Sequence, residues 1–190
     1  AAAYLATDRF RCLRRAGLWI AGVLLILLAL VSPLDAIADT YLFSVHMAKH
    51  IVFVLVIPAL LLLGTPPIWP ERLLKYRPVS RVERLLARPA VSWTAGIGAM
   101  ALWHVPVLFH AALTHEGLHI AEHLSLLVAG TIYWWPILSP LPRLRLAPVP
   151  QSVAYLFTSC AACTTMGVLI TFAPHSLYPA YAQPHDVYGI

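Results

Sequence analysis

The sequence predicts an all-helical bundle that crosses a lipid bilayer several times. Of its 190 residues, 60% are hydrophobic and only 11% are charged, whereas a soluble domain carries roughly a quarter charged residues. Long runs of Leu, Val, Ile and Ala recur along most of the chain, and its mean hydropathy is +0.76. This composition argues against a disordered tail or a nucleic-acid-binding domain, and three cysteines are too few for a secreted disulfide scaffold.

Five segments are long and apolar enough to span a hydrocarbon core about 30 Å thick, which requires ~20 helical residues. They run over about 16–34, 41–64, 90–110, 115–135 and 151–173. Most of the 16 prolines fall between these segments, where helices must stop. Pro58 and Pro106 lie inside spans, where we expect them to kink a helix rather than end it. We therefore predict one transmembrane helical domain over residues 1–190.

The basic residues predict the direction of the spans. All of them except Lys49 lie before the first span, between the second and third, or between the fourth and fifth. The positive-inside rule places these three segments in the cytoplasm, so the net charge of +5 reflects topology rather than nucleic-acid binding. The first segment is basic and stays inside, unlike a cleaved signal peptide.

With this topology all nine histidines fall in the outer half of the bundle. At 1.5 Å per residue, His46 and His50 lie roughly 8 and 14 Å below the outer end of their helix. We expect His119 and His123 at the same two depths, and His104 in the same layer. Three further histidines lie near the surface, where we expect no functional role: His110, His115 and His185.

The spacing of the histidines indicates a metal site. The pairs His46/His50 and His119/His123 are each separated by four residues, so each pair shares one helix face. Two such pairs on different helices can offer nitrogen ligands to one ion in the core of a bundle. Imidazole combined with thioether sulfur suits copper, although zinc and iron also accept imidazole. The candidate ligands are His46, Met47, His50, His104, His119, Glu122, His123, Met166 and His175.

Simpler interpretations exist for these residues and their neighbours. Polar side chains in spans also hydrogen-bond neighbouring helices as packing contacts, but a cluster of ionisable groups in a membrane favours a functional site. Cys160 and Cys163 could hand a copper ion on toward Met166, although small packing residues are the commoner role. We expect Lys49 either to reach the outer surface or to pair with a carboxylate.

Two alternative functions fit parts of the pattern. His119 to His123 spells H-x-x-E-H, which matches the inverted zinc-protease motif, with the histidines as ligands and Glu122 as general base. Paired histidines on two parallel helices could also hold haem b in an electron carrier.

Several stretches together resemble the CtaG family of membrane proteins that assist cytochrome c oxidase assembly. They are SPLDAIAD (32–39), HMAKH (46–50), LLLLGTPP (60–67), WHVP (103–106), LHIAEHLSLLVAGTIYWWPIL (118–138) and TFAPHSLYPAY (171–181). The stretches cover nearly the whole chain in the order of the family. Six of the candidate ligands match positions of the family motif: His46, His50, His104, His119, Glu122 and His123.

The resemblance implies a non-enzymatic assembly factor in the bacterial inner membrane that delivers copper, as Cu(I), to cytochrome c oxidase subunits. The other expected partners are the lipid bilayer and, in a homodimer, a second copy of the chain. Members of the family typically have seven spans, so this chain would be a fragment that lacks the first and the last.

Overall fold

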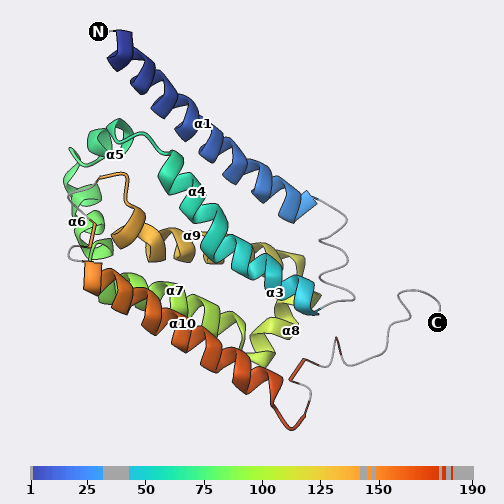
Figure 1. The fold of residues 1–190 in the computed structure, drawn as a ribbon. Coiled ribbons are helices and arrows are strands. Elements are labelled where there is room, and N and C mark those ends of the chain that lie inside the picture. The colour runs from blue at the N-terminus through green and yellow to red at the C-terminus, as the bar shows by residue number, and fades with distance from the viewer. Residues whose placement is uncertain are drawn as a thin grey trace.

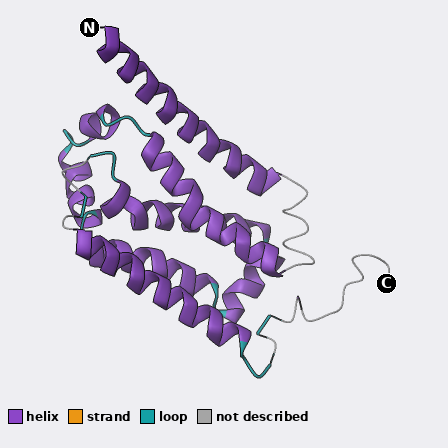
Figure 2. Ribbon diagram, in the orientation of Figure 1, coloured by secondary structure: helices purple, strands orange, loops and turns teal. Residues whose placement is uncertain are grey.

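A computed structural model describes residues 2–31, 43–141, 145–146, 149–175, 177–178 and 181. The described residues form helices and connecting loops, with no strand among them (Figure 2). The α-helices, labelled in Figure 1, are α1 (Ala2–Val31), α3 (Phe43–Ile51), α4 (Ile57–Gly64), α5 (Ile68–Leu73), α6 (Arg77–Leu86), α7 (Pro89–Trp103), α8 (Pro106–Thr114), α9 (Glu116–Leu138) and α10 (Val149–Thr171), and the π-helical segment η1 (Val52–Val56) joins α3 to α4. Residues 32–34 and 41–42 of the predicted spans lie outside the described part of the chain.

Three helical segments are long and apolar enough to cross a membrane: Phe10–Val31, Phe43–Gly64 and Val149–Thr171. The pair α6 and α7, bent by 76°, provides a fourth if it is counted as one broken span. The described residues thus support a helical membrane protein and contain three or four candidate spans, so the predicted count of five is not confirmed. Helix α9 covers the remaining predicted span and carries His119, Glu122 and His123.

Helix α9 occupies the centre of the packing. It contacts η1 and α4 on one side and α7 and α8 on the other, while α1 packs on α4 and α10 packs on α7 (Figure 1). The buried apolar core lies where these helices meet, and it includes Phe53, Ile57, Met100, Trp103 and Leu126. The candidate ligands of α9 therefore project into a packed interior.

A π-helical segment interrupts the second predicted span without ending it. Val52–Val56 forms this segment, and Pro58 follows in the first turn of α4. Because proline has no backbone N–H, Pro58 cannot make the α-helical hydrogen bond to the carbonyl of Val54. A Cβ added to Gly130 of α9 would collide with that carbonyl oxygen and would lie 2.8 Å from the Cα of Val54. The absence of a side chain at Gly130 thus lets α9 approach the π-helical turn.

The prediction of one continuous helix over 90–110 was wrong, because the chain breaks between α7 and α8. Val105 is extended, with φ −65° and ψ 123°, and Pro106 begins α8. A residue that precedes proline is driven out of the α-helical region by the proline ring. Pro106 therefore separates two helices instead of kinking one, and the break places His104 at the end of α7.

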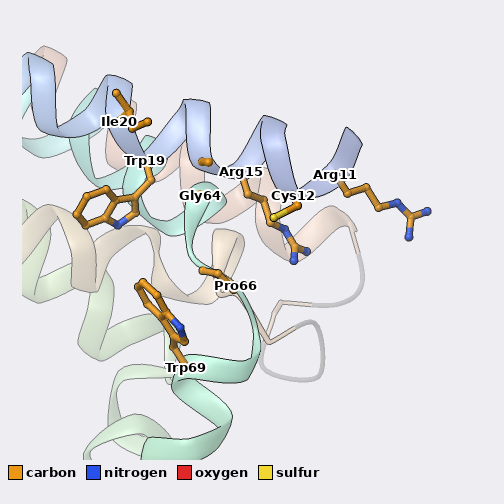
Figure 3. A pocket seen from close by; sticks show the side chains of 9 residues that line it. Arg11, Cys12, Arg15, Trp19, Ile20, Gly64, Pro66 and Trp69 are labelled. Carbon is orange, nitrogen blue, oxygen red and sulfur yellow. The ribbon is translucent and has the colours of Figure 1, made fainter. Parts of the chain in front are cut away.

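A cavity of about 480 Å³ lies at the Gly64 end of α4, which is the end farther from α3. Its lining includes Arg11, Arg15 and Trp19 of α1 and Trp69 of α5 (Figure 3). Arg15 extends toward the loop that carries Pro66, whereas Arg11 points away from the helices. This basic and aromatic end of the molecule contains none of the candidate metal ligands.

Candidate metal centre

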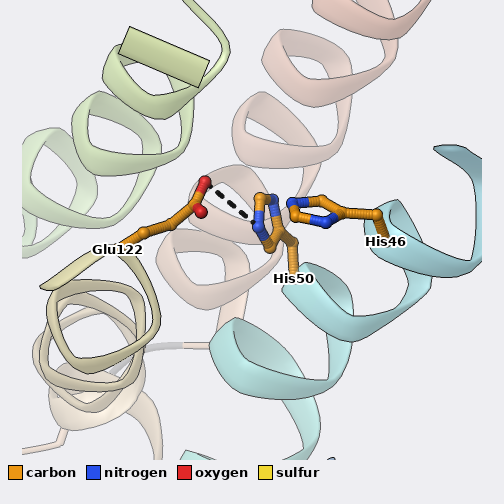
Figure 4. A group of neighbouring side chains, drawn as sticks. All are labelled: His46, His50 and Glu122. Carbon is orange, nitrogen blue, oxygen red and sulfur yellow. Dashed lines mark ion pairs between the residues drawn. The ribbon is translucent and has the colours of Figure 1, made fainter. Parts of the chain in front are cut away.

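His46 and His50 of α3 meet Glu122 of α9 in the interior of the protein (Figure 4). One ligand atom of each side chain lies within 4.8 Å of those of the other two. His50 Nε2 is 3.3 Å from Glu122 Oε1, and the exposed fractions of the three residues are 1% or less. Two imidazoles and a carboxylate therefore converge at the distances that a shared metal ion requires.

The second predicted histidine pair faces the first. The ring centroids of His46 and His119 are 6.1 Å apart, and those of His50 and His123 are 5.9 Å apart. The ring centroids of His46 and His50 on α3 are 4.5 Å apart, and those of His119 and His123 on α9 are 4.4 Å apart. These distances are as expected for residues one helical turn from each other. The two helices thus bring four imidazoles and Glu122 into one cluster.

Aromatic side chains enclose this cluster. The ring of Phe53 stacks on His123 at 4.8 Å, and Phe109 lies edge-on to His46 at 5.1 Å. His50 Nδ1 and His123 Nε2 are buried and have no hydrogen-bond partner among the described residues. Burial of a polar atom without a partner is costly, so these nitrogens fit a site whose ligand completes their interactions.

His104 lies beside the cluster, with its ring 5.8 Å from that of His50. Its Nδ1 is 2.7 Å from the carbonyl oxygen of Met100, and its Nε2 is 3.0 Å from Met47 Sδ. The phenol of Tyr178 donates a hydrogen bond of 2.9 Å to the backbone carbonyl of His104. Burial raises the pKa of Tyr178 above its usual value, so this hydroxyl stays protonated as a donor.

The structure separates the nine candidate ligands into groups. His46, His50 and Glu122 converge, and His119 and His123 adjoin them. Met47, His104 and Met166 line a neighbouring cavity together with His50. His175, beyond the end of α10, has an exposed side chain. His110 and His115 are exposed as expected, and His185 lies outside the described residues.

Two further residues near the cluster, Lys49 and Met100, add to the picture from the sequence. Lys49 is only 6% exposed, so its side chain does not reach the surface as one of the two predictions supposed. Met100, which sequence analysis did not select, lines the same cavity as Met47 and Met166. Its place in an apolar run of α7 resembles that of any core residue, and no spacing signal distinguishes it.

These features define a helical membrane protein with a buried histidine–glutamate cluster between two central helices. The chain belongs to the family of cytochrome c oxidase caa3 assembly factors, Caa3_CtaG, whose sequence profile matches residues 2–189. This match confirms the family that the sequence motifs indicate.

Mycobacterial proteins share part of the sequence. The uncharacterized proteins Mb0105 of Mycobacterium bovis and MT0111 of Mycobacterium tuberculosis are each 28% identical over 131 residues, which is 61% of this chain and 20% of theirs. The uncharacterized protein ML1998 of Mycobacterium leprae is 28% identical over 157 residues, 73% of this chain and 23% of its own length. The chain thus spans about a fifth of these relatives. No solved structure matches it.

Proposed function

We propose that this protein takes part in the assembly of cytochrome c oxidase by binding copper as a cargo and passing it to oxidase subunits. Membership of the family supports the role in assembly. The observation that carries the copper proposal is the convergence of His46, His50 and Glu122, with ligand atoms within 4.8 Å of one another in a buried part of the helical bundle.

The two imidazoles and the carboxylate of this site support copper as the bound ion. Imidazole nitrogens bind copper well, and one carboxylate offsets part of the charge of the ion in an environment of low polarity. Histidine coordinates a metal only as the neutral imidazole, which is the form that burial favours.

The position of Glu122 favours binding over hydrolysis. A hydrolase using the H-x-x-E-H segment would coordinate zinc through His119 and His123 and keep Glu122 as a separate base. Here the glutamate carboxylate instead approaches His50 of α3. We therefore assign Glu122 to the ligand set, with His119 and His123 as neighbouring or additional ligands.

Metal analysis of the purified protein tests this function. The full chain in detergent is loaded with Cu(I) under reducing conditions, desalted and analysed for metal and for visible absorption. We expect tightly bound copper in the wild type and less of it in the His46→Ala/His50→Ala variant. His110→Ala is the matched control, since His110 is exposed and belongs to the same predicted layer.

Three outcomes would overturn the copper assignment. Equal copper retention in the double variant would mean that the ion binds elsewhere. Preferential retention of zinc would direct attention to hydrolysis, and a Soret band in the protein as purified would indicate haem b.

A further inference from the structure

All three methionines of the chain line one cavity. Met47 on α3, Met100 on α7 and Met166 on α10 border a space of about 270 Å³. Cys163, one helical turn before Met166, lines the same space. Methionine is scarce in this sequence, so the presence of all three methionines, from three helices, in one cavity wall makes this cavity chemically distinct.

A histidine completes the wall of the cavity. The carbonyl of Met100 can only accept a hydrogen bond, so His104 Nδ1, at 2.7 Å, carries the proton. In the neutral ring Nε2 then holds the lone pair, and this atom is 3.0 Å from Met47 Sδ. An imidazole nitrogen and a thioether sulfur, both electron-pair donors, thus face each other.

The cavity adjoins the histidine–glutamate cluster without sharing most of its residues. His46 and Glu122 do not line it, whereas His50 does. His50 is 1% exposed, and its Nδ1 has no hydrogen-bond partner among the residues that the structure describes. His50 is therefore the one residue common to the converging triad and the methionine cavity.

From this arrangement we infer a second cargo site, in which the thioethers of Met47, Met100 and Met166 and Nε2 of His104 bind a soft monovalent cation, Cu(I). Thioether sulfur is a soft ligand that suits Cu(I), whereas carboxylate and water oxygens suit harder ions such as magnesium and calcium. This inference rests on the proposed copper function and extends it. Copper would occupy two adjacent positions of different softness, with His50 between them, and would move between α9 and α10 inside the protein.

If the three methionines serve only to fill the core, substitution by leucine is expected to have a different result. Methionine fills irregular gaps in apolar cores, and exchange of methionine for leucine nearly conserves volume. If the three side chains only pack, leucine replaces them with little effect on ion binding. If they bind an ion, leucine removes the ligand atom while it keeps the core filled.

The experiment uses the full chain in detergent micelles with 13C-labelled methionine methyl groups. Silver ion, a redox-inert probe for Cu(I), is added, and the three methyl resonances are followed by NMR. Single Met47→Leu, Met100→Leu and Met166→Leu variants assign the resonances. We expect Ag(I) to shift all three, and we expect Met47→Leu to weaken Ag(I) binding at this site by about tenfold or more, since loss of even outer-shell groups costs roughly 10–100-fold.

Two further variants separate the sites. Ile170→Leu, which changes another residue of the cavity wall without touching sulfur, should leave the Ag(I) shifts unchanged. In the His46→Ala/Glu122→Gln variant the methionine shifts should persist, because neither residue lines the cavity. If Ag(I) moves no methionine resonance, or if the shifts disappear in that variant, a separate methionine site does not exist.

Failure of either proposal is recognisable by itself. Copper retention that depends on His46 and His50, with no methionine shifts, would uphold the proposed function and refute the second site. Methionine shifts in a protein whose copper retention does not depend on these histidines would uphold the second site and refute the first.

Discussion

His50 Nε2 lies 3.3 Å from Glu122 Oε1, and this contact joins the α3 and α9 helices inside the protein. The two residues are 1% and 0% exposed. Enclosing an imidazole and a carboxylate away from water is costly unless further contacts compensate for lost solvation. Under the proposed function Glu122 shares an ion with His50, which makes Glu122 the most informative residue to change.

We expect Glu122→Gln to lower copper affinity by at least about 10–100-fold, because the change removes a charged ligand and keeps the shape of the side chain. Competition with a chromogenic Cu(I) chelator measures this affinity. Glu116→Gln, an exposed change at the start of the same helix, should leave it unaltered. Equal affinities of the two variants would remove Glu122 from the ligand set.

The approach of α9 to the π-helical turn predicts the effect of adding one methyl group. Gly130→Ala would place a Cβ against the Val54 backbone, and we expect a loss of about 1–3 kcal/mol of stability from overpacking. Gly98→Ala meets nothing within 4 Å in α7, so higher helix propensity should stabilise by up to about 1 kcal/mol. Thermal unfolding in detergent compares the two, and similar melting temperatures would contradict the packing described.

Tyr178 predicts a pH-dependent contribution to stability. Its pKa is raised by burial, so the hydrogen bond to His104 contributes fully below the unfolded value of about 10 and is lost as pH rises through the folded pKa. We expect Tyr178→Phe to cost about 0.5–1.5 kcal/mol at neutral pH. The difference in unfolding free energy between the wild type and Tyr178→Phe should become smaller above pH ~10.

Denaturant unfolding at several pH values measures this difference. Tyr76→Phe serves as control, because Tyr76 is exposed and its hydroxyl should not contribute. A gap between wild type and Tyr178→Phe that stays constant up to strongly alkaline pH would exclude the phenol as the titrating donor.

The predicted orientation of the protein in the membrane can be tested by labelling single cysteines from the outer side. In a chain whose three cysteines are replaced by serine, Glu116→Cys should react with a membrane-impermeant maleimide in intact cells. Arg84→Cys should react only after the membrane is opened, because the positive-inside rule places its segment in the cytoplasm. Both positions are exposed, so a maleimide can reach them. The reverse labelling pattern would invert the predicted topology and would place the histidine–glutamate cluster near the inner face of the membrane.

The sequence alone was sufficient for the helical membrane architecture, because hydropathy and proline placement are local properties of the chain. It also predicted that His46 and His50 share a face, as do His119 and His123, since the helical repeat places residues four apart together. The matched depths of the two pairs placed them in one layer, and the structure brings their rings within about 6 Å of one another.

Only the tertiary structure decided which donors converge. The depth of a residue along a helix does not determine which neighbouring helix its side chain faces. The approach of Glu122 to His50 therefore depends on how α3 and α9 pack against each other. The break at Val105 depends on how the chain accommodates Pro106, which can kink a helix or end it. Met100 has no local signature, and its association with Met47 and Met166 arises because three helices distant in sequence meet around one cavity.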